Sequence, residues 1–587
     1  MNIKLDYFRN NASDGNIYAR CIGEESDFDI IYTLFEGKEK EHFSIKKKAY
    51  GDELVTFKLT SGCDYYLHAQ LKLSNGQDVE LCSDIISTLP SSNFLPPTNC
   101  KIEDMTDIKG KLKITSEGRQ DFIIQFYPGG YKKLQCEARH NVPLFFKARR
   151  YIDFAPCFDK KTLSGIIKKF PLSKKLRELY RVRQNLVNDD LLQLAQEIER
   201  LDYVEYCSLS GDPTSESLPS EWETYPQEVD IANVTPNLTQ HQGYLDNTTR
   251  GMSVRAAWAR NVTGRGVSVH MQDTGVWPDH EDLIGNITVV NNSYENRDHG
   301  TWSAGVIAAS NNGIGMMGIA YDCRLFAYIN TFTDFEKIVR DALPGDIVTA
   351  SLGWDYSALP LVHHQAWWSM YRLLVSSGVV VVLLSGNGGL DLSQSVEFNN
   401  FGDSGVILAT ASHPDNRRRL EFSNYNFTRM IAAWGMDVAT TGEGDLLNLG
   451  HPNRTYTANY GGTSASAPQI AGVLALIQSY AKSAYHVIFS GDQLYQIIRV
   501  TGHREGEADL IGPRPNVHAA LEYVDYLLGP GEPTPPPPEY PLWRVGVQYE
   551  VGDRVSHLGL NYICRSRHVS NVGWQPQLAV TLWTRIP

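Results

Sequence analysis

The sequence predicts an α/β fold, a doubly wound parallel sheet, over residues 250–528, and three observations indicate it. Short apolar runs recur through this part of the chain, among them GVSVHMQD, GDIVTASLG, GVVVVLLSGN and GVILATAS. Stretches with helical character, such as HHQAWWSMYRLLVSS, lie between these runs. The runs are nearly continuous rather than alternating with polar residues, which is typical of parallel strands covered by helices on both faces.

Two further units precede this domain, because 587 residues exceed the roughly 100–200 that one domain usually holds. Residues 1–97 alternate apolar and polar residues, as in LVTFKL and DYYLHAQLKL, and have a turn signal at 74–76, which predicts a β-sandwich. Residues 98–210 contain the strand-like runs DFIIQFY and DYVEYCSL. Between them SGIIKKFPLSKKLRELYRV, broken at Pro171, and DDLLQLAQEIERL have helical spacing, so a small α/β unit is expected.

Two linkers separate the remaining parts of the chain. Residues 211–249 are acidic and rich in proline, serine and threonine, and residues 529–541 read GPGEPTPPPPEYP, a stiff spacer. Residues 542–587 follow and are dense in aromatic residues and turn signals, which predicts a small C-terminal β module.

Composition excludes several classes of function. A formal net charge of −13 argues against a nucleic-acid partner, which needs a basic face. No apolar run reaches the roughly 18 residues of a membrane span, and the start MNIKLDYFRNNASDGN has no apolar core of a signal peptide. The nine cysteines have no close CxxC spacing, so no metal ligands are expected from them.

Four segments carry residues suited to chemistry. Asp273 ends an apolar run, His299 precedes small residues and an apolar helix, Asn387 lies between glycines after VVVVLL, and Ser464 precedes QIAGVLALIQSY. Each has a plainer alternative on its own: a strand-end turn, a surface histidine near a cap, a Gly-Asn turn and a helix N-cap. Because the carboxyl ends of parallel strands meet at one edge of a sheet, we expect the four to lie together.

Taken in the order Asp, His, Asn, Ser, these segments resemble the subtilisin-like proteases, over residues of about 240–525. GTSASAP, SGNGG and NNGIGMMGIAY resemble the kexin and furin branch most closely. His299 follows Asp273 after 26 positions, a shorter connection than that branch has, which puts its calcium site there in doubt. The second histidine of many subtilisins is replaced by Trp302.

The resemblance implies a role for each residue. Ser464 attacks the peptide carbonyl, His299 moves the proton, Asp273 orients His299, and Asn387 donates to the oxyanion. This chemistry requires no metal and no organic cofactor, and a structural calcium ion is left open.

The resemblance also implies a strand that pairs with the substrate, Ser351-Leu352-Gly353, with Asp355 close behind. The alternative is an ordinary core strand. Asp355, Asp391 and Glu397 are candidates for an acidic specificity pocket, or else solvated loop charges. No lysine or arginine lies between Arg200 and Arg250, so self-cleavage there would not follow a basic residue.

The flanking units resemble known accessory domains. Residues 98–210, with LAQEIERLDYVEYC, are similar to subtilisin propeptides, and a plain accessory domain is the alternative. The tail resembles the small chitin-binding type of carbohydrate-binding module. There we expect Tyr562, His568 and Trp574 at the surface, where aromatic rings stack on sugars. The same resemblance places Trp543, Tyr549 and Trp583 inside.

The sequence thus predicts an exported or extracellular serine endopeptidase, self-inhibited by a propeptide and tethered to chitin-like polysaccharide. Its partners are a protein or peptide substrate and the glycan. The alternative functions are a catalytically latent glycan-binding protein and an assembly component held by the flanking units.

Overall fold

The structure is a computed structural model in which the largest described part is residues 234–529, without 248–249, 294–295, 355–356 and 504–507. Parts of residues 4–87, 121–210 and 543–586 are described as well. Among these residues, none of the helices combines the length and the apolar character that crossing a bilayer requires.

A seven-stranded parallel sheet forms the centre of the molecule, with strand order β14-β15-β13-β16-β19-β20-β21. Its strands are β13 (Ser268–Asp273), β14 (Ile287–Val289), β15 (Arg324–Ile329), β16 (Ile347–Ala350), β19 (Val380–Leu384), β20 (Ile407–Ser412) and β21 (Met430–Trp434). All neighbouring pairs are parallel. The predicted doubly wound parallel sheet is therefore confirmed, and the four apolar runs form β13, β16, β19 and β20.

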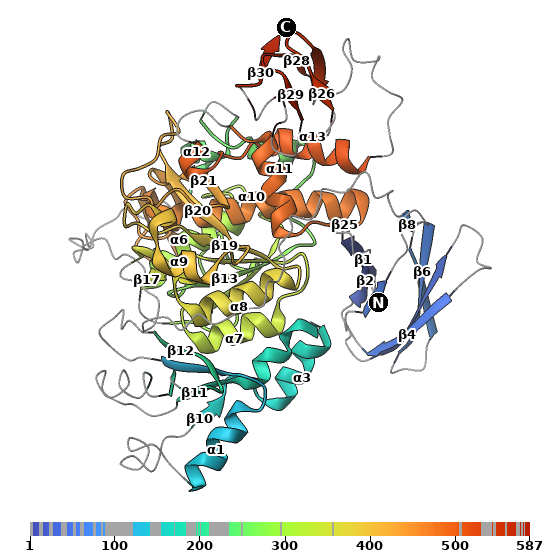
Figure 1. Cartoon of the computed structure of the whole chain (residues 1–587). Coiled ribbons are helices and arrows are strands. Elements are labelled where there is room, and N and C mark those ends of the chain that lie inside the picture. Colours follow the sequence, from blue (N-terminus) through green and yellow to red (C-terminus); the bar gives the residue numbers. More distant parts are fainter. Residues whose placement is uncertain are drawn as a thin grey trace.

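Helices cover both faces of this sheet (Figure 1). One face packs against α5 (Val254–Ala259), α6 (Arg297–Ala308), α10 (Gly462–Tyr485), α11 (Gly491–Thr501) and α13 (Val517–Leu528). The other packs against α7 (Phe332–Asp341), α8 (Gln365–Ser376) and α9 (Val396–Phe401). Strand β19 shows why both faces need cover, because successive side chains of a strand point to opposite faces of the sheet. Val380 and Val382 pack in the apolar cluster on the α10 face, and Val381 and Leu383 pack in the cluster on the α7 and α8 face.

The strand order places a topological switch point at β13. This strand comes first in the chain yet lies between β15 and β16, so the connections from it run toward opposite edges of the sheet. Asp273 is the last residue of β13 and therefore lies at the carboxyl end of the strand where the winding reverses. Crevices at such points are the usual ligand sites of open α/β sheets.

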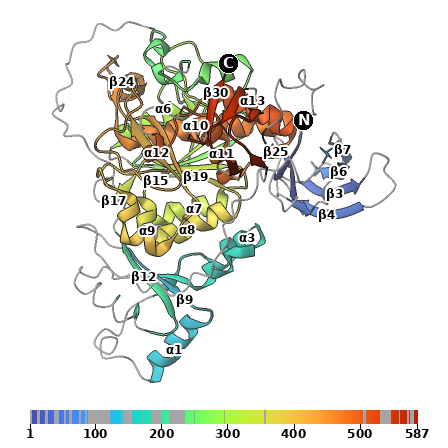
Figure 2. The ribbon, with the colours of Figure 1, turned by 45° about the horizontal axis from the view of Figure 1, so that its top comes forward.

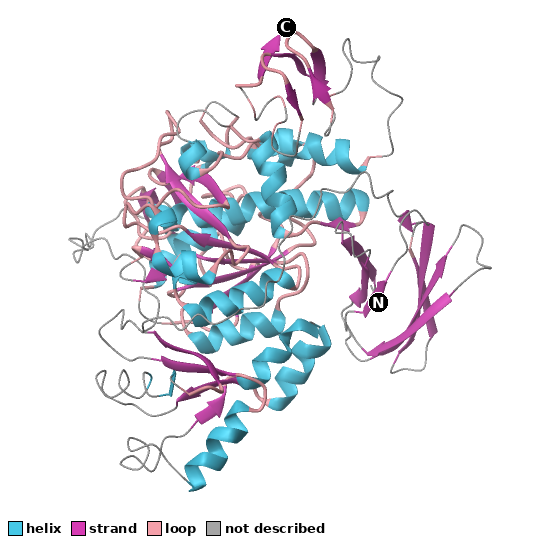
Figure 3. Ribbon diagram, viewed as in Figure 1, coloured by secondary structure: helices cyan, strands magenta, loops and turns pink. Residues whose placement is uncertain are grey.

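The N-terminal unit contains two sheets (Figure 3). Their strand orders are β25-β1-β2-β5 and β4-β3-β6-β7, and the second also carries β8. The strands are β1 (Lys4–Asn10), β2 (Asn16–Ile22), β3 (Phe28–Glu36), β4 (Ser44–Tyr50), β5 (Val55–Lys58), β6 (Asp64–Leu73), β7 (Asp78–Cys82) and β8 (Ile86–Ser87). Both sheets contribute to one apolar cluster that includes Ala19, Phe57, Tyr32 and Leu67. Strand β1 also pairs in parallel with β25 (Val487–Ile488), beyond the end of α10.

Residues 121–210 form an antiparallel sheet of order β10-β11-β9-β12, which packs with α3 against helices α7 and α8 (Figures 1 and 2). Its elements are β9 (Asp121–Phe126), α1 (Gly130–His140), β10 (Phe154–Pro156), α3 (Lys160–Lys169), a 3-10 helix (Pro171–Glu178), β11 (Leu179–Val182) and β12 (Val204–Ser210). The predicted strands β9 and β12 and the break at Pro171 are confirmed. The helical expectation for LYRV is wrong, because 179–181 pair with β9.

The C-terminal module has two small sheets, formed by β26 (Gln548–Tyr549) with β29 (His568–Val569), and by β27 (Arg554–His557), β28 (Leu560–Cys564) and β30 (Trp583–Ile586). Trp543, Tyr549 and Trp583 build its core, as predicted. The surface placement of Tyr562 and His568 is wrong, because their exposed fractions are only 4% and 8%. Trp574 is 41% exposed, as predicted.

Candidate active site

A short hydrogen bond joins Asp273 to His299. The Nδ1 atom of His299 lies 2.6 Å from Oδ1 of Asp273, and both side chains are almost completely buried. The backbone N–H of Thr274 donates to the same carboxylate oxygen at 2.8 Å, which fixes the plane of the carboxylate. With Nδ1 held by the carboxylate, Nε2 is the nitrogen left for exchanging a proton with a substrate or nucleophile.

Ser464 is the third residue of α10, the long helix that begins at Gly462 directly after β24 (Thr455–Tyr460). Its hydroxyl donates to the carbonyl of Ser351 at 3.2 Å, so the predicted nucleophile lies beside the predicted substrate strand. Ser464 and His299 are both among the described residues, and no hydrogen bond joins their side chains. Hydrogen bonds between catalytic groups are often long without substrate, and a rotation about the Ser464 side chain would exchange the Ser351 carbonyl for His299. The start of α10 favours negative charge near Ser464.

Asn387 follows β19 and reaches the start of α10. Its Oδ1 atom accepts a hydrogen bond from the backbone N–H of Thr463 at 2.9 Å and one from the Thr463 hydroxyl at 2.8 Å. The backbone N–H of Asn387 donates to the carbonyl of Ser357 at 2.7 Å. The Asn387 side chain is therefore held one residue away from Ser464.

The predicted substrate strand, Ser351-Leu352-Gly353, ends at the first residue of β17 (Gly353–Trp354). Strand β17 pairs with β18 (Leu359–Pro360) in an antiparallel hairpin. Ser351, Leu352 and Gly353 are all buried. One edge of β17 is thus taken by the chain itself, and only the other edge is left for a peptide. Asp355 lies outside the described residues.

The two other candidates for an acidic pocket have partners within the chain. Asp391 accepts hydrogen bonds from the hydroxyl and backbone N–H of Ser393 and from the side chain of Asn426. Its hydrogen bond from the Ser393 hydroxyl lowers the pKa of Asp391 below its ordinary value. Glu397 forms an ion pair with His363 at 3.1 Å. Both carboxylates therefore have local structural roles.

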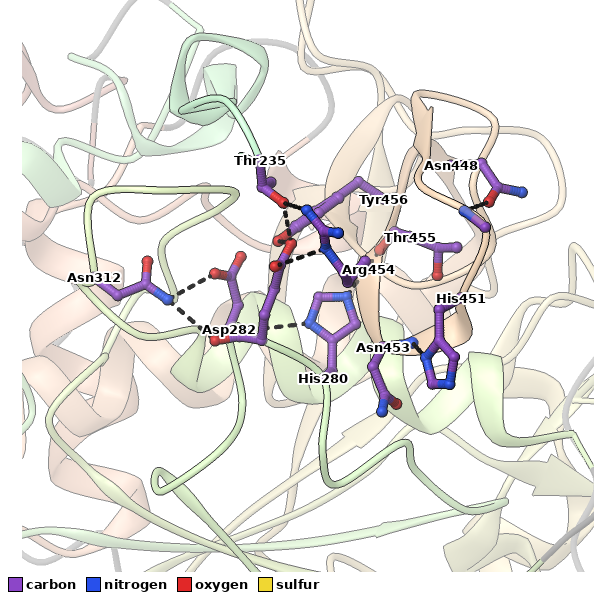
Figure 4. A network of polar contacts seen from close by, with 12 residues as sticks. Thr235, His280, Asp282, Asn312, Asn448, His451, Asn453, Arg454, Thr455 and Tyr456 are labelled. Carbon is purple, nitrogen blue, oxygen red and sulfur yellow. Dashed lines mark hydrogen bonds and ion pairs between the residues drawn. The ribbon is translucent and has the colours of Figure 1, made fainter. Parts of the chain in front are cut away.

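A buried polar network that sequence reasoning missed holds the connection between Asp273 and His299 (Figure 4). His280 bonds to the carbonyl of Thr455 at 2.9 Å, and Asp282 accepts hydrogen bonds from the backbone of Met316 and the side chain of Asn312. Burial raises the pKa of Asp282 to about 7. The network ties the connection to the strand that leads into α10, which keeps the elements of His299 and Ser464 in register.

Within the described ranges, no three or more histidine, cysteine, aspartate or glutamate side chains are grouped to hold a metal ion. A structural calcium ion therefore stays a prediction.

Two aromatic side chains pack around His299. The ring centroid of Trp302 lies 5.7 Å from that of His299, and the ring of Tyr460 meets His299 edge-on at the same distance. Trp302 stood out in the sequence as a replacement for a histidine. Nothing in the local pattern around Tyr460 marked it, because its contact with His299 joins segments 161 positions apart.

Comparisons with known proteins identify the families to which two parts of the chain are similar. The Subtilase family model matches residues 264–513, and the model of carbohydrate-binding module family 5/12 matches residues 542–584. Subtilisin BL from Lederbergia lenta is 30% identical over 266 residues, which cover 44% of this chain and 91% of that protein. M-protease from Shouchella clausii (strain KSM-K16) is 28% identical over 361 residues, covering 56% of this chain and 84% of its own length.

Among solved structures, fervidolysin from Fervidobacterium pennivorans, described as a keratinolytic enzyme related to subtilisin, matches with a TM-score of 0.46 and 17% identity. The match covers 71% of this chain and 64% of fervidolysin. These relatives are bacterial, so the expected likeness to the kexin and furin branch is not supported. The chain belongs to the subtilase family: it is a subtilisin-like serine endopeptidase that carries a family 5/12 carbohydrate-binding module.

Proposed function

We propose that Asp273, His299 and Ser464 form the catalytic triad of this endopeptidase, with Asn387 as the side-chain donor to the oxyanion. The observation that carries the proposal is the 2.6 Å contact between His299 Nδ1 and Asp273 Oδ1 at the switch point of the sheet. A buried carboxylate in this position holds the imidazole in one tautomer and stabilises its charged form.

The proposed reaction uses protein groups alone. The Ser464 hydroxyl turns from the Ser351 carbonyl toward His299, gives its proton to Nε2 and attacks the scissile carbonyl. His299 then passes the proton to the leaving amine, which leaves an ester on Ser464. A water molecule, activated by the same nitrogen, hydrolyses the ester and restores the enzyme.

Charge that develops on the carbonyl oxygen needs donors that are already in place. Asn387 Nδ2 and the backbone N–H of Ser464 are the proposed pair, supported by the two hydrogen bonds that hold Oδ1 of Asn387 on Thr463. The substrate is proposed to add as a strand to the edge of Ser351–Gly353 that β18 does not cover.

We further propose that residues 121–210 act as a propeptide that helps the catalytic domain to fold and then inhibits it. Support comes from the apolar cluster that Ile123, Leu179 and Tyr206 share with Phe335 and Tyr371 of α7 and α8. A link of residues 211–233 leads from this unit back to the catalytic domain, and cutting it would release the unit.

The C-terminal module is proposed to tether the enzyme to a chitin-like polysaccharide, with Trp574 as the stacking residue. Its exposed ring, 41% accessible, and the family 5/12 match support this assignment. A protease with such a tether acts where polysaccharide is found, so we propose that it works outside the cell.

The test is the intact mass of the purified wild type beside Ser464→Ala. The expected result is a cut within residues 211–233 in the wild type and an uncut chain of 65.8 kDa in the variant. Mixing tagged Ser464→Ala with wild type then separates cutting in cis from cutting in trans. If both chains stay whole and neither hydrolyses denatured casein, the protein is the catalytically latent glycan-binding component instead.

A further inference from the structure

A proline interrupts the backbone hydrogen bonding of α10 at the residue proposed as the nucleophile. In an α-helix the carbonyl of one residue accepts the N–H of the residue four positions later. Pro468 lies four positions after Ser464, inside α10, and has no N–H to donate. The carbonyl of Ser464 therefore loses its helical partner while the residue is buried, and a buried carbonyl without a partner is costly.

The hydroxyl of Tyr460 takes the place of the missing N–H. It donates to the Ser464 carbonyl at 2.7 Å, and Tyr460 is only 2% exposed. The hydroxyl of Ser303 lies 2.9 Å from the Tyr460 oxygen. A phenol has a single O–H proton, and Tyr460 uses it in the hydrogen bond to the Ser464 carbonyl. The Ser303 hydroxyl must therefore be the donor in the second hydrogen bond.

This pair of bonds links the two helices that carry His299 and Ser464. Ser303 lies on α6, one turn after His299, and the Ser464 carbonyl belongs to the first turn of α10. The Tyr460 ring meets the His299 ring edge-on, with an interplanar angle of 85°, and packs against Trp302 at 5.2 Å between centroids. One side chain thus contacts two of the three proposed members of the triad, His299 and Ser464.

We propose that Tyr460 is a positioning residue, whose hydroxyl fixes the backbone of Ser464 against the helix of His299. This inference rests on the proposed triad and goes beyond it. The hydroxyl of Tyr460 bonds to the Ser464 carbonyl and to Ser303, rather than to the Ser464 hydroxyl or an imidazole nitrogen. Without the hydroxyl, the Ser464 carbonyl has neither the Tyr460 hydrogen bond nor the helical N–H that Pro468 lacks. The first turn of α10 is then free to shift Ser464 relative to Nε2 of His299.

The phenol is suited to this role because it keeps its proton. Burial, followed by the nearby charge of Asp273, raises the pKa of Tyr460 well above its ordinary value. The donor to Ser464 is therefore present throughout the pH range in which His299 can act as a base.

Tyr460→Phe tests the proposal because it removes the hydroxyl and leaves the ring on His299 and Trp302. The expected result is a fall in kcat of about tenfold to a hundredfold with KM changed less than about twofold, and an equal slowing of labelling by a serine-directed phosphonate. Tyr244→Phe is the matched control, since Tyr244 is also fully buried and donates to a carbonyl, that of Ala439, at 3.0 Å. It should lose similar stability and keep its kcat.

A second background makes the test specific to the Ser464 carbonyl. In Pro468→Ala the helix regains an N–H for that carbonyl, so adding Tyr460→Phe should then cost less than about threefold in kcat. The proposal is overturned if Tyr460→Phe keeps kcat within about twofold of the wild type, or if its loss is equal in both backgrounds. An inactive, unlabelled wild type would instead refute the proposed triad itself.

Discussion

The side-chain oxygen of Asn387 accepts two hydrogen bonds from one residue, Thr463: one from its backbone N–H at 2.9 Å and one from its hydroxyl at 2.8 Å. A backbone N–H can only donate, so the atom that faces Thr463 has to be the oxygen, and the amide nitrogen faces away. The orientation of the proposed oxyanion donor is therefore set before any substrate binds, which is the condition under which such donors are most effective.

Asn387→Ala should reduce kcat for a peptide substrate by about 10²–10³ while KM changes little, because the donor acts on charge that exists only in the transition state. Steady-state kinetics on a chromogenic peptide would measure both constants. Thr463→Val, which keeps the backbone N–H and removes the hydroxyl, should cost about fivefold. An Asn387→Ala enzyme with a raised KM and an unchanged kcat would assign Asn387 to substrate binding instead.

Trp574→Ala should weaken binding to insoluble chitin by roughly tenfold, since it removes the exposed ring proposed to stack on the sugar. Sedimentation of the Ser464→Ala protein with chitin particles measures this without self-digestion. Val551→Ala is the control, because Val551 is 67% exposed in the same module and has no ring. Equal binding by both variants would place the glycan elsewhere on the module.

Acid should destabilise the catalytic domain through two buried histidines. Burial lowers the pKa of His280 to about 4 and that of His364 to about 3 in the folded protein. Both values lie below the ordinary pKa of 6.5, so each neutral ring contributes its full share of folding stability above pH 6.5. That contribution is lost as pH falls through the folded pKa, about 4 for His280 and about 3 for His364. At pH 5 each histidine should cost about 2 kcal/mol of stability.

The comparison that checks this is unfolding of the wild type and His364→Gln at pH 7.5 and pH 5, followed by tryptophan fluorescence. The variant should lose less stability between the two pH values than the wild type does. An identical loss in both proteins would show that His364 does not take part in the acid response.

The ion pair between Arg181 and Glu336 should hold the 121–210 unit on α7. The two charged groups are 2.6 Å apart and largely buried, with side-chain exposures of 22% and 11%. Arg181→Ala leaves a buried carboxylate without this partner, at a cost of about 2 kcal/mol. Amide hydrogen exchange in β11 and α7 should accelerate in the Ser464→Ala background.

Lys133→Ala is the control for this interface. Its ion pair with Asp202 is longer, at 3.5 Å, and lies at the surface of the same unit, so its loss should leave exchange unchanged. If Arg181→Ala behaves like Lys133→Ala, the apolar cluster alone holds the unit in place.

Much of the catalytic domain could be predicted because its signals are local. The apolar runs of β13, β16, β19 and β20 are continuous. Each of the four site residues lies at the end of a strand, within three positions after one, or in the first turn of a helix. Parallel topology then brings the ends of those elements to one edge of the sheet. Asp273 and His299 meet for this reason, although neither motif specifies the 2.6 Å contact between them.

The errors arose where tertiary pairing decides the outcome. Leu179–Val182 has the composition of a helix end, but pairing with β9 makes it a strand. Successive side chains of β28 point to opposite faces of the strand, so Tyr562 shares a face with Cys564 and not with Asn561. That face packs in the core of the module. His568 pairs with Tyr549 and packs edge-on against Trp583, 5.2 Å between ring centroids. Contacts between separate strands are not encoded in a single motif.

The most direct test of the proposed triad is active-site labelling. The wild type, Ser464→Ala and His299→Ala are each treated with a serine-directed fluorophosphonate, and the modified peptide is identified by mass spectrometry. The proposed triad predicts one label, on Ser464, in the wild type, and none in either variant. A label on another serine, or undiminished labelling of Ser464 in His299→Ala, would contradict it.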